Sequence, residues 1–201
     1  LATSNNDVTI TSTTLTRPSF GGLTYSAAES LAFIARRSAL GQVVHVNSTA
    51  AGTPVFIGVY DVLHTVNVNE TSPAAPVTLF SSLADNVINV NTDGVGNAAV
   101  NLIDYTIHRM GAVTIGSGGL MRVPPSGDKI VTVTSLAITG TGKLDLNDND
   151  LIVDYTGATP IATIQALIRS GHNGGTWRGS GITSSFANAS TQAVAGRLNR
   201  A

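Results

Sequence analysis

The densest group of potential metal ligands is a run of Asp and Asn side chains around residue 147. Asp145, Asn147 and Asn149 stand at alternate positions. Carboxylate and amide oxygens spaced in this way suit Ca²⁺, so these three residues are a candidate Ca²⁺ site. An EF-hand loop that began at Asp145 would need Gly in sixth place and Glu in twelfth, where the chain has Asp150 and Thr156. A polar turn between two strands is therefore the preferred interpretation, since Asn and Asp tolerate left-handed backbone, and no cofactor is expected.

The single Trp of the chain lies in a glycine-rich segment. Trp177 precedes Arg178 and follows His172, with glycines at 174, 175, 179 and 181. An aromatic ring beside a cation can stack on a sugar, which makes Trp177, Arg178 and His172 the candidate ligand-binding residues. Alternatively, the ring plugs the open end of a core while the glycines let the segment wrap closely. We expect the plug, with Trp177 mostly buried against a helix at 160–170 or the last strand layer.

Histidines and carboxylates supply a second set of candidates. No two of the four histidines have the His-x-x-x-His spacing of a zinc helix, and His45 and His64 lie in apolar segments typical of structural histidines. Asp61, Asp104 and His108 could provide an acid and a base, but nothing in their spacing brings them together. The chain also lacks Cys, a nucleophile elbow and a phosphate-binding loop. We therefore expect no catalytic residues and no enzymatic turnover.

Composition limits the partners and indicates a compartment. The 201 residues carry a formal net charge of -1, which gives no electrostatic reason to expect nucleic acid or an anionic membrane as a partner. Only 11% of residues are charged, whereas Thr, Asn and Gly number 25, 15 and 21, as is typical of extracellular β proteins. No apolar run approaches the roughly 18 residues of a membrane helix. The start has neither Met nor a signal peptide, so we expect a piece of a longer secreted or cell-surface protein.

Short alternating segments, separated by Gly, Pro, Asn or Ser, predict a chain made mainly of β-strands. Two segments instead predict helices. Residues 26–40 have a capping-box spacing of Ser26 and Glu29, a helical apolar stripe and a final Gly41. Residues 160–170 follow Thr159 as N-cap, begin with Pro and end before Gly171 as the C-terminal cap.

An internal repeat predicts how the strands are arranged. The segment 116–120, Gly-Ser-Gly-Gly-Leu, is echoed 24 residues later by Gly-Thr-Gly-Lys-Leu at 140–144, each after a β-branched run. A fixed period in the twenties predicts a parallel β-solenoid, in which each turn packs against the next; a β-sandwich with two similar hairpins is the alternative. In the solenoid, Leu120 and Leu144 would lie at equivalent positions of adjacent strands, about 4.8 Å apart.

Residues 112–186 also resemble a known group of proteins. The line at 142–157, Gly-Lys-Leu-Asp-Leu-Asn-Asp-Asn-Asp-Leu-Ile-Val-Asp-Tyr-Thr-Gly, precedes the expected helix and then the motif Gly-Gly-Thr-Trp-Arg-Gly-Ser-Gly-Ile-Thr-Ser-Ser at 174–185. This order is similar to the C-terminal region of large secreted planctomycete-type proteins, which are autotransporter-like and end in dockerin or PEP-CTERM sorting segments. The resemblance implies secretion and a β-helix, and it implies no activity.

These observations lead to one organisation and two functions. Residues 1–110 are expected to be β-rich and of unknown type, and residues 111–201 to hold solenoid turns, the helix and the Trp loop, unless both form one continuous domain. We expect a non-catalytic structural, adhesive or self-assembling module of a secreted or cell-surface bacterial protein, whose partner is a second copy or a polysaccharide. A polysaccharide-binding or polysaccharide-cleaving module is the alternative, and it would need a surface row of aromatic and carboxylate side chains.

Overall fold

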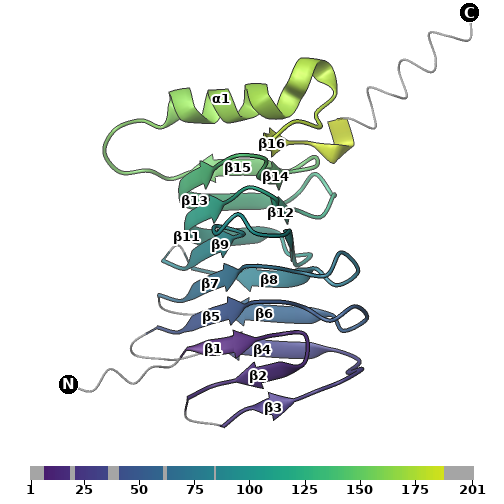
Figure 1. Ribbon diagram of the computed structural model, residues 1–201. Coiled ribbons are helices and arrows are strands. Elements are labelled where there is room, and N and C mark those ends of the chain that lie inside the picture. Colours follow the sequence, from purple (N-terminus) through teal and green to yellow (C-terminus); the bar gives the residue numbers. More distant parts are fainter. Residues whose placement is uncertain (1–6, 19–20, 36–40, 61–62, 84, 188–201) are drawn as a thin grey trace, which may run out of the picture.

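In the computed structural model the chain winds into a parallel β-solenoid with two sheets around one core (Figure 1). The structure describes residues 7–18, 21–35, 41–60, 63–83 and 85–187. The nine-stranded sheet contains, in chain order, β1 (Val8–Ile10), β2 (Thr14–Thr16), β3 (Leu23–Thr24), β5 (Val43–Val46), β7 (Thr65–Val68), β9 (Val87–Val90), β11 (Ile107–Ile115), β13 (Ile130–Ile138) and β15 (Asp150–Val153). The seven-stranded sheet contains β4 (Leu31–Ala35), β6 (Val55–Val59), β8 (Val77–Ser81), β10 (Ala98–Leu102), β12 (Gly119–Arg122), β14 (Lys143–Asp145) and β16 (Gly181–Thr183).

The chain alternates between the two sheets from β4 onward, so each turn of the solenoid adds one strand to each sheet. Neighbouring strands are parallel, except that β1–β2 and β2–β3 pair antiparallel at the N-terminal end. This arrangement confirms the predicted solenoid over the sandwich. Strand β11 crosses residue 110 and pairs with β9 before it and β13 after it, so the nine-stranded sheet runs through that position without a break.

Alternating side chains explain why these segments form stacked strands. In the central turns, Val44, Val66 and Ile88 are fully buried and aligned in register. The intervening positions face outward and are polar: Asn89 donates a 2.8 Å side-chain hydrogen bond to Asn67, 22 residues earlier. Asn69 donates in the same way to Asn47. One face of each strand thus builds the core, and the other forms ladders of Asn between turns.

The predicted 24-residue register is wrong by one position. Strands β12 and β14 are adjacent and parallel, as expected, but Leu120 pairs with Lys143 and Met121 pairs with Leu144. Because successive side chains point to opposite faces, this shift leaves Leu120 on the outer face while Leu144 is buried. The turns also differ in length, from 20 residues between Val131 and Leu151 to 25 between Ile88 and Val113.

The helix predicted at 26–40 is not formed where the structure describes this segment. Residues 31–35 are β4, which pairs in register with β6, and residues 36–40 lie outside the described part. Leu31, Phe33 and Ala35 face the core, and Ala32 and Ile34 face outward. Of the apolar residues that suggested a helical stripe, Leu31 and Ala35 also fit the inner face of a strand, whereas Ile34 faces outward. Pairing with β6 outweighs the local helix propensity.

The second predicted helix is confirmed as α1 (Ile161–His172). Ile164 and Leu167 pack against the core, and α1 lies across the C-terminal end of the stack (Figure 1). The caps differ from the expectation: Asn173 takes the left-handed conformation that was assigned to Gly171. Gly171 is required for another reason, because a Cβ atom there would overlap the carbonyl oxygen of Ile182 in β16.

The opposite end of the solenoid is less closed. Among the described residues, β3 pairs only with β2, and β4 pairs only with β6. Leu23 in β3 and Ile34 in β4 are about half exposed. The N-terminal end therefore presents two strand edges, whereas a helix covers the C-terminal end.

Candidate functional site

A cleft of about 320 Å³ opens on the outer face of the seven-stranded sheet, close to α1. Its floor comes from β12, β14 and β16, and its rim comes from the segment between α1 and β16. We call it the Trp177 cleft; its lining residues are Leu120, Arg122, Lys143, Asp145, Trp177, Arg178, Thr183 and Ser185. It contains two of the three predicted ligand-binding residues, Trp177 and Arg178, and the third, His172, supports the Trp ring from outside the cleft.

Trp177 is positioned by the end of α1. Its backbone N–H donates to the carbonyl oxygen of His172 at 3.0 Å, and its ring meets the His172 ring edge to face at 4.9 Å. The expected neighbour, the end of the helix, is thus correct. The expected burial is also correct, because Trp177 is mostly covered, and the part of the ring that stays accessible lines the cleft. Its backbone has φ 55°, a left-handed conformation that bulky residues seldom adopt.

Two of the surrounding glycines permit the close wrap that the sequence suggested. A Cβ atom at Gly179 would overlap the Ser170 carbonyl oxygen, and one at Gly181 would crowd the Leu167 carbonyl oxygen. Gly174 and Gly175 have open space around them and instead supply positive φ angles within η1 (Asn173–Gly175). The segment is therefore tight beside the helix and open at its tip.

Asp145 is the carboxylate at the floor of the cleft, and its side chain is only 4% exposed. Its oxygens accept hydrogen bonds from the Ser185 backbone N–H at 2.9 Å, the Ser185 hydroxyl and the Asn147 backbone N–H at 3.2 Å. Arg122 Nε donates to the same carboxylate at 3.3 Å. Burial alone would raise the pKa of Asp145, but the hydrogen bonds together outweigh it and hold the pKa below its usual value.

Three cationic side chains surround this carboxylate. Arg122 is paired with Asp145 and remains 46% exposed, while Lys143 Nζ donates to the Arg178 carbonyl oxygen at 2.9 Å. The Arg178 side chain is exposed and has no hydrogen bond or ion pair with another described residue. The cleft therefore has three positive groups and one neutralised negative group around an aromatic ring.

The candidate Ca²⁺ residues serve the polar turn between β14 and β15. Asn147 has φ 55° and donates its side-chain amide to the Val123 carbonyl oxygen. Asn149 donates to the carbonyl oxygens of Pro124 and Leu146. The three residues do not converge on a common point, and nowhere in the described ranges are three or more His, Asp or Glu side chains placed to hold a metal ion. The geometry is that of the turn.

The candidate acid and base residues each have a different role in the structure. Asp104 is 83% exposed and forms a 2.8 Å ion pair with Lys129. His108 is fully buried, and its Nε2–H donates to the Ile103 carbonyl oxygen at 3.0 Å. His64 is also buried, with Nδ1 accepting from the Gln42 backbone N–H. Asp61 lies outside the described residues.

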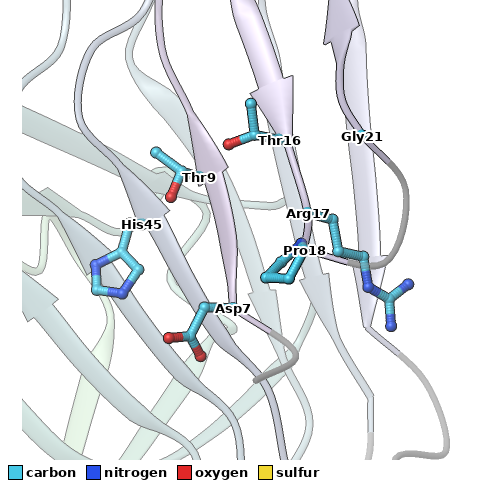
Figure 2. Close-up of a pocket in the computed structure, with 7 residues that line it drawn as sticks. All are labelled: Asp7, Thr9, Thr16, Arg17, Pro18, Gly21 and His45. Carbon is cyan, nitrogen blue, oxygen red and sulfur yellow. The ribbon is translucent and has the colours of Figure 1, made fainter. Parts of the chain in front are cut away.

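A second hollow, of about 470 Å³, lies on the outer face of the nine-stranded sheet near the N-terminal end. Figure 2 shows His45 from β5 and Asp7 beside β1 on one side of it, with Arg17 across from them. His45 lies 3.4 Å from the Asn67 side-chain amide, so it belongs to the same outward polar ladder as the Asn residues. The Nε atom of Arg17 is buried and has no hydrogen-bond partner among the described residues.

Sequence reasoning missed an aromatic row along one corner of the solenoid. Phe80 contacts Tyr60 at a ring-centroid distance of 4.8 Å and Tyr105 at 5.2 Å. Phe80 is buried, whereas the Tyr105 side chain is 57% exposed. The spacings of 20 and 25 residues match the length of a turn. A clearer signal was also present, since Val-His-Val-Asn at 44–47, Val-Asn-Val-Asn at 66–69 and Ile-Asn-Val-Asn at 88–91 repeat every 22 residues.

Compared with protein-family models, curated proteins and solved structures, the chain has no significant match. The helices of the described part are too short or too polar to cross a lipid bilayer. The site must therefore be interpreted from its own geometry.

Proposed function

We propose that this chain is a non-catalytic structural and adhesive module of a secreted or cell-surface protein, with the solenoid as a rigid support for the Trp177 cleft. The observation that carries the proposal is the continuous stacking of the two sheets, from β3 to β15 and from β4 to β16. Each strand buries its inner face against neighbours in the next turn, so the turns support one another along the whole stack.

The polar side chains of the outer faces support the structural role. The Asn47–Asn69 and Asn67–Asn89 hydrogen bonds join turns in the nine-stranded sheet, and Ser117 and Thr141 join turns at a corner through a 3.0 Å hydroxyl contact. These polar groups form hydrogen bonds that hold neighbouring turns together. The side chains that could act as an acid or a base are those of Asp104, His64 and His108. Each forms an ion pair or hydrogen bond with another part of the fold, and none of these contacts joins one of the three to another.

The adhesive role is supported by the position of the cleft. It lies on an outer sheet face, at the end of the stack that α1 covers, where a large ligand can approach. A mostly buried Trp whose accessible surface lines a cleft beside cations is suited to a sugar ring, because the sugar offers an apolar face and polar edges. We therefore take polysaccharide as the partner.

Incubating the chain with insoluble polysaccharides tests this function. The soluble and bound protein are measured after sedimentation, and the supernatant is assayed for reducing ends and unsaturated products with and without Ca²⁺. We expect retention without product. Product release that disappears in His108→Gln, with the fold intact by circular dichroism, would overturn the non-catalytic role. A chain that is retained by no polysaccharide would lose the adhesive role.

Self-association is the second candidate function, and the free edges of β3 and β4 favour it. Unpaired backbone N–H and C=O groups on a strand edge can pair with another chain. Sedimentation velocity over a range of concentrations tests this idea. A sedimentation coefficient that does not change with concentration would exclude it.

A further inference from the structure

We propose that the Trp177 cleft binds a sugar residue that carries an anionic group, a carboxylate or a sulfate, within an acidic polysaccharide. This inference rests on the proposed adhesive function and names the ligand class for it. Three features of the cleft carry it: the charge balance, the state of the Trp ring and strands whose edges are already paired or covered.

The charge balance of the cleft favours an anion. Arg122, Lys143 and Arg178 contribute three positive charges to the lining, and Asp145 is the single carboxylate. Asp145 is 4% exposed and accepts four hydrogen bonds, one of them from Arg122, so the charges of Arg122 and Asp145 offset each other and those of Lys143 and Arg178 remain. Arg178 has no other described partner, so it is the cation most available to a ligand. Cations that face solvent beside a covered carboxylate attract negative groups.

The Trp177 ring is held in a position where a ligand can stack on it. A left-handed backbone is unfavourable at a bulky residue, and such strain persists only where surrounding contacts impose it. Here the His172 ring contact and the hydrogen bond to the His172 carbonyl oxygen impose it. The result is that the ring lines the cleft and does not fold into the core. Its indole N–H donates to no other described residue, which leaves one donor for a ligand oxygen.

The strands at the cleft favour a sugar over a peptide. Strand β14 is paired on both sides, with β12 and with β16, so its backbone cannot take up an added peptide strand. Strand β16 is the edge of the sheet, but α1 covers it, since Gly171 lies against the Ile182 carbonyl oxygen. Recognition must therefore use side chains that project from the sheet face. An aromatic surface flanked by cations matches a ring with an acidic substituent.

Binding is measured by isothermal titration with four probes: polygalacturonate, dextran sulfate, neutral dextran and poly-glutamate. We expect both acidic polysaccharides to bind, with affinity that falls as salt rises, and neutral dextran and poly-glutamate to bind at least about tenfold more weakly. Comparing the carboxylated with the sulfated probe tells which anionic group is preferred.

Variants place the binding in the cleft. Trp177→Ala and Arg178→Gln should each weaken binding by about tenfold, and Trp177→Phe should retain most of it. Two variants outside the cleft serve as matched controls: Arg169→Gln removes an exposed cation of α1, and Tyr155→Ala removes an exposed aromatic ring. Both should bind as the parent does, and circular dichroism checks that each variant is folded.

The outcomes separate this inference from the proposed function. Equal binding of neutral dextran would overturn the anionic ligand and leave the adhesive role in place. Equal binding of poly-glutamate would overturn the inference that the ligand is a sugar. Undiminished binding by folded Trp177→Ala and Arg178→Gln would overturn the location. Binding of none of the polysaccharides would overturn both the inference and the adhesive role.

Discussion

Asp145 ties the last turn of the solenoid to residues that follow β16. Its carboxylate accepts hydrogen bonds from Ser185, 40 residues later, and from the Arg122 side chain in the preceding turn. Replacement by Asn removes the charge that these donors stabilise. We expect Asp145→Asn to lower the free energy of unfolding at pH 7 by about 2 kcal/mol, measured by urea denaturation. Asp154→Asn, at an exposed position, is the control and should change little.

The hydrogen bonds to the Asp145 carboxylate also predict how its contribution to the free energy of unfolding varies with pH. The folded-state pKa of Asp145 is lowered, so its stabilisation is complete above the unfolded pKa of about 3.9 and is lost as pH falls through the folded value. The difference between the parent chain and Asp145→Asn should therefore shrink below about pH 4. A difference that stays constant from pH 7 to pH 3 would contradict the assignment.

His108 is expected to make the fold sensitive to mild acid. Burial lowers its pKa, and the nearby Lys129 charge lowers it further, against the hydrogen bond to Ile103. Its Nδ1 is buried and has no hydrogen-bond partner in the described part of the chain, so the protonated ring would have an uncompensated donor there. Since the unfolded chain takes up the proton more readily, stability should fall as pH drops below about 6.5.

Thermal unfolding at pH 7.5 and 5.5 measures this effect. His108→Gln can keep the donor to the Ile103 carbonyl oxygen but does not titrate, so its melting temperature should change less between the two pH values than that of the parent. His172→Gln, at an exposed histidine, should behave as the parent does. An identical pH response in parent and His108→Gln would show that another group is responsible.

Single residues also show where sequence reasoning reached its limit. The turn at Asn147 was predicted, because left-handed backbone is a local property of Asn. The cleft that Trp177 lines was not, because it depends on how the segment after α1 lies on β12 and β14, far away in sequence. The left-handed backbone of Trp177 was not predicted either, because nothing in the local residue types favours it.

At the scale of elements, the packing of α1 on β16 depends on one position. Gly to Ala inside a helix normally stabilises by up to about 1 kcal/mol. Gly171→Ala should instead destabilise the protein by several kcal/mol, because the added Cβ would overlap the Ile182 carbonyl oxygen and push the helix away from β16.

Thermal or urea unfolding, compared with Gln165→Ala, checks this prediction. Gln165 is an exposed residue of the same helix, so its replacement changes helix propensity without touching β16. If Gly171→Ala is as stable as the parent, the close contact between α1 and β16 is not present in solution.

The two predicted helices differ in how far their patterns constrain them. At 160–170 the apolar residues recur at helical spacing, and alternation is absent. At 31–35, Leu31 and Ala35 fit both periods, whereas Phe33 fits only a strand and Ile34 fits only the helical stripe. The choice there is made by β6, which supplies backbone partners for all five residues. The local helix propensity of residues 31–35 contains no information about a partner strand that lies 24 residues further along the chain.

At the scale of the whole molecule, turns of equal length should be interchangeable. Val44, Val66 and Ile88 follow one another at 22-residue intervals in the same register. Deleting residues 65–86 removes one complete turn and brings β9 against β5 and β10 against β6. We expect the shortened chain to fold with a single cooperative transition, at a lower melting temperature because it has fewer neighbour contacts.

Deleting residues 65–75 is the matched control, since it removes half a turn. Strand β8 would then follow His64 and fall in the wrong sheet, so this chain should not fold. Circular dichroism and thermal unfolding distinguish the two deletions. Equal loss of structure in both would show that the turns are not equivalent, whereas the sequence repeat at 44–47, 66–69 and 88–91 indicates that they are.

The difference between the two ends of the stack limits how many copies can associate and how many ligand-binding clefts the assembly presents. Because α1 covers the C-terminal end, two copies that pair through β3 and β4 would meet head to head, and no further copy could add to the outer ends. Each copy has its Trp177 cleft near the covered end, so the pair would present two clefts far apart, one near each outer end. Such a pair could bridge two strands of a polysaccharide network, and its retention would exceed that of either cleft alone through effective concentration.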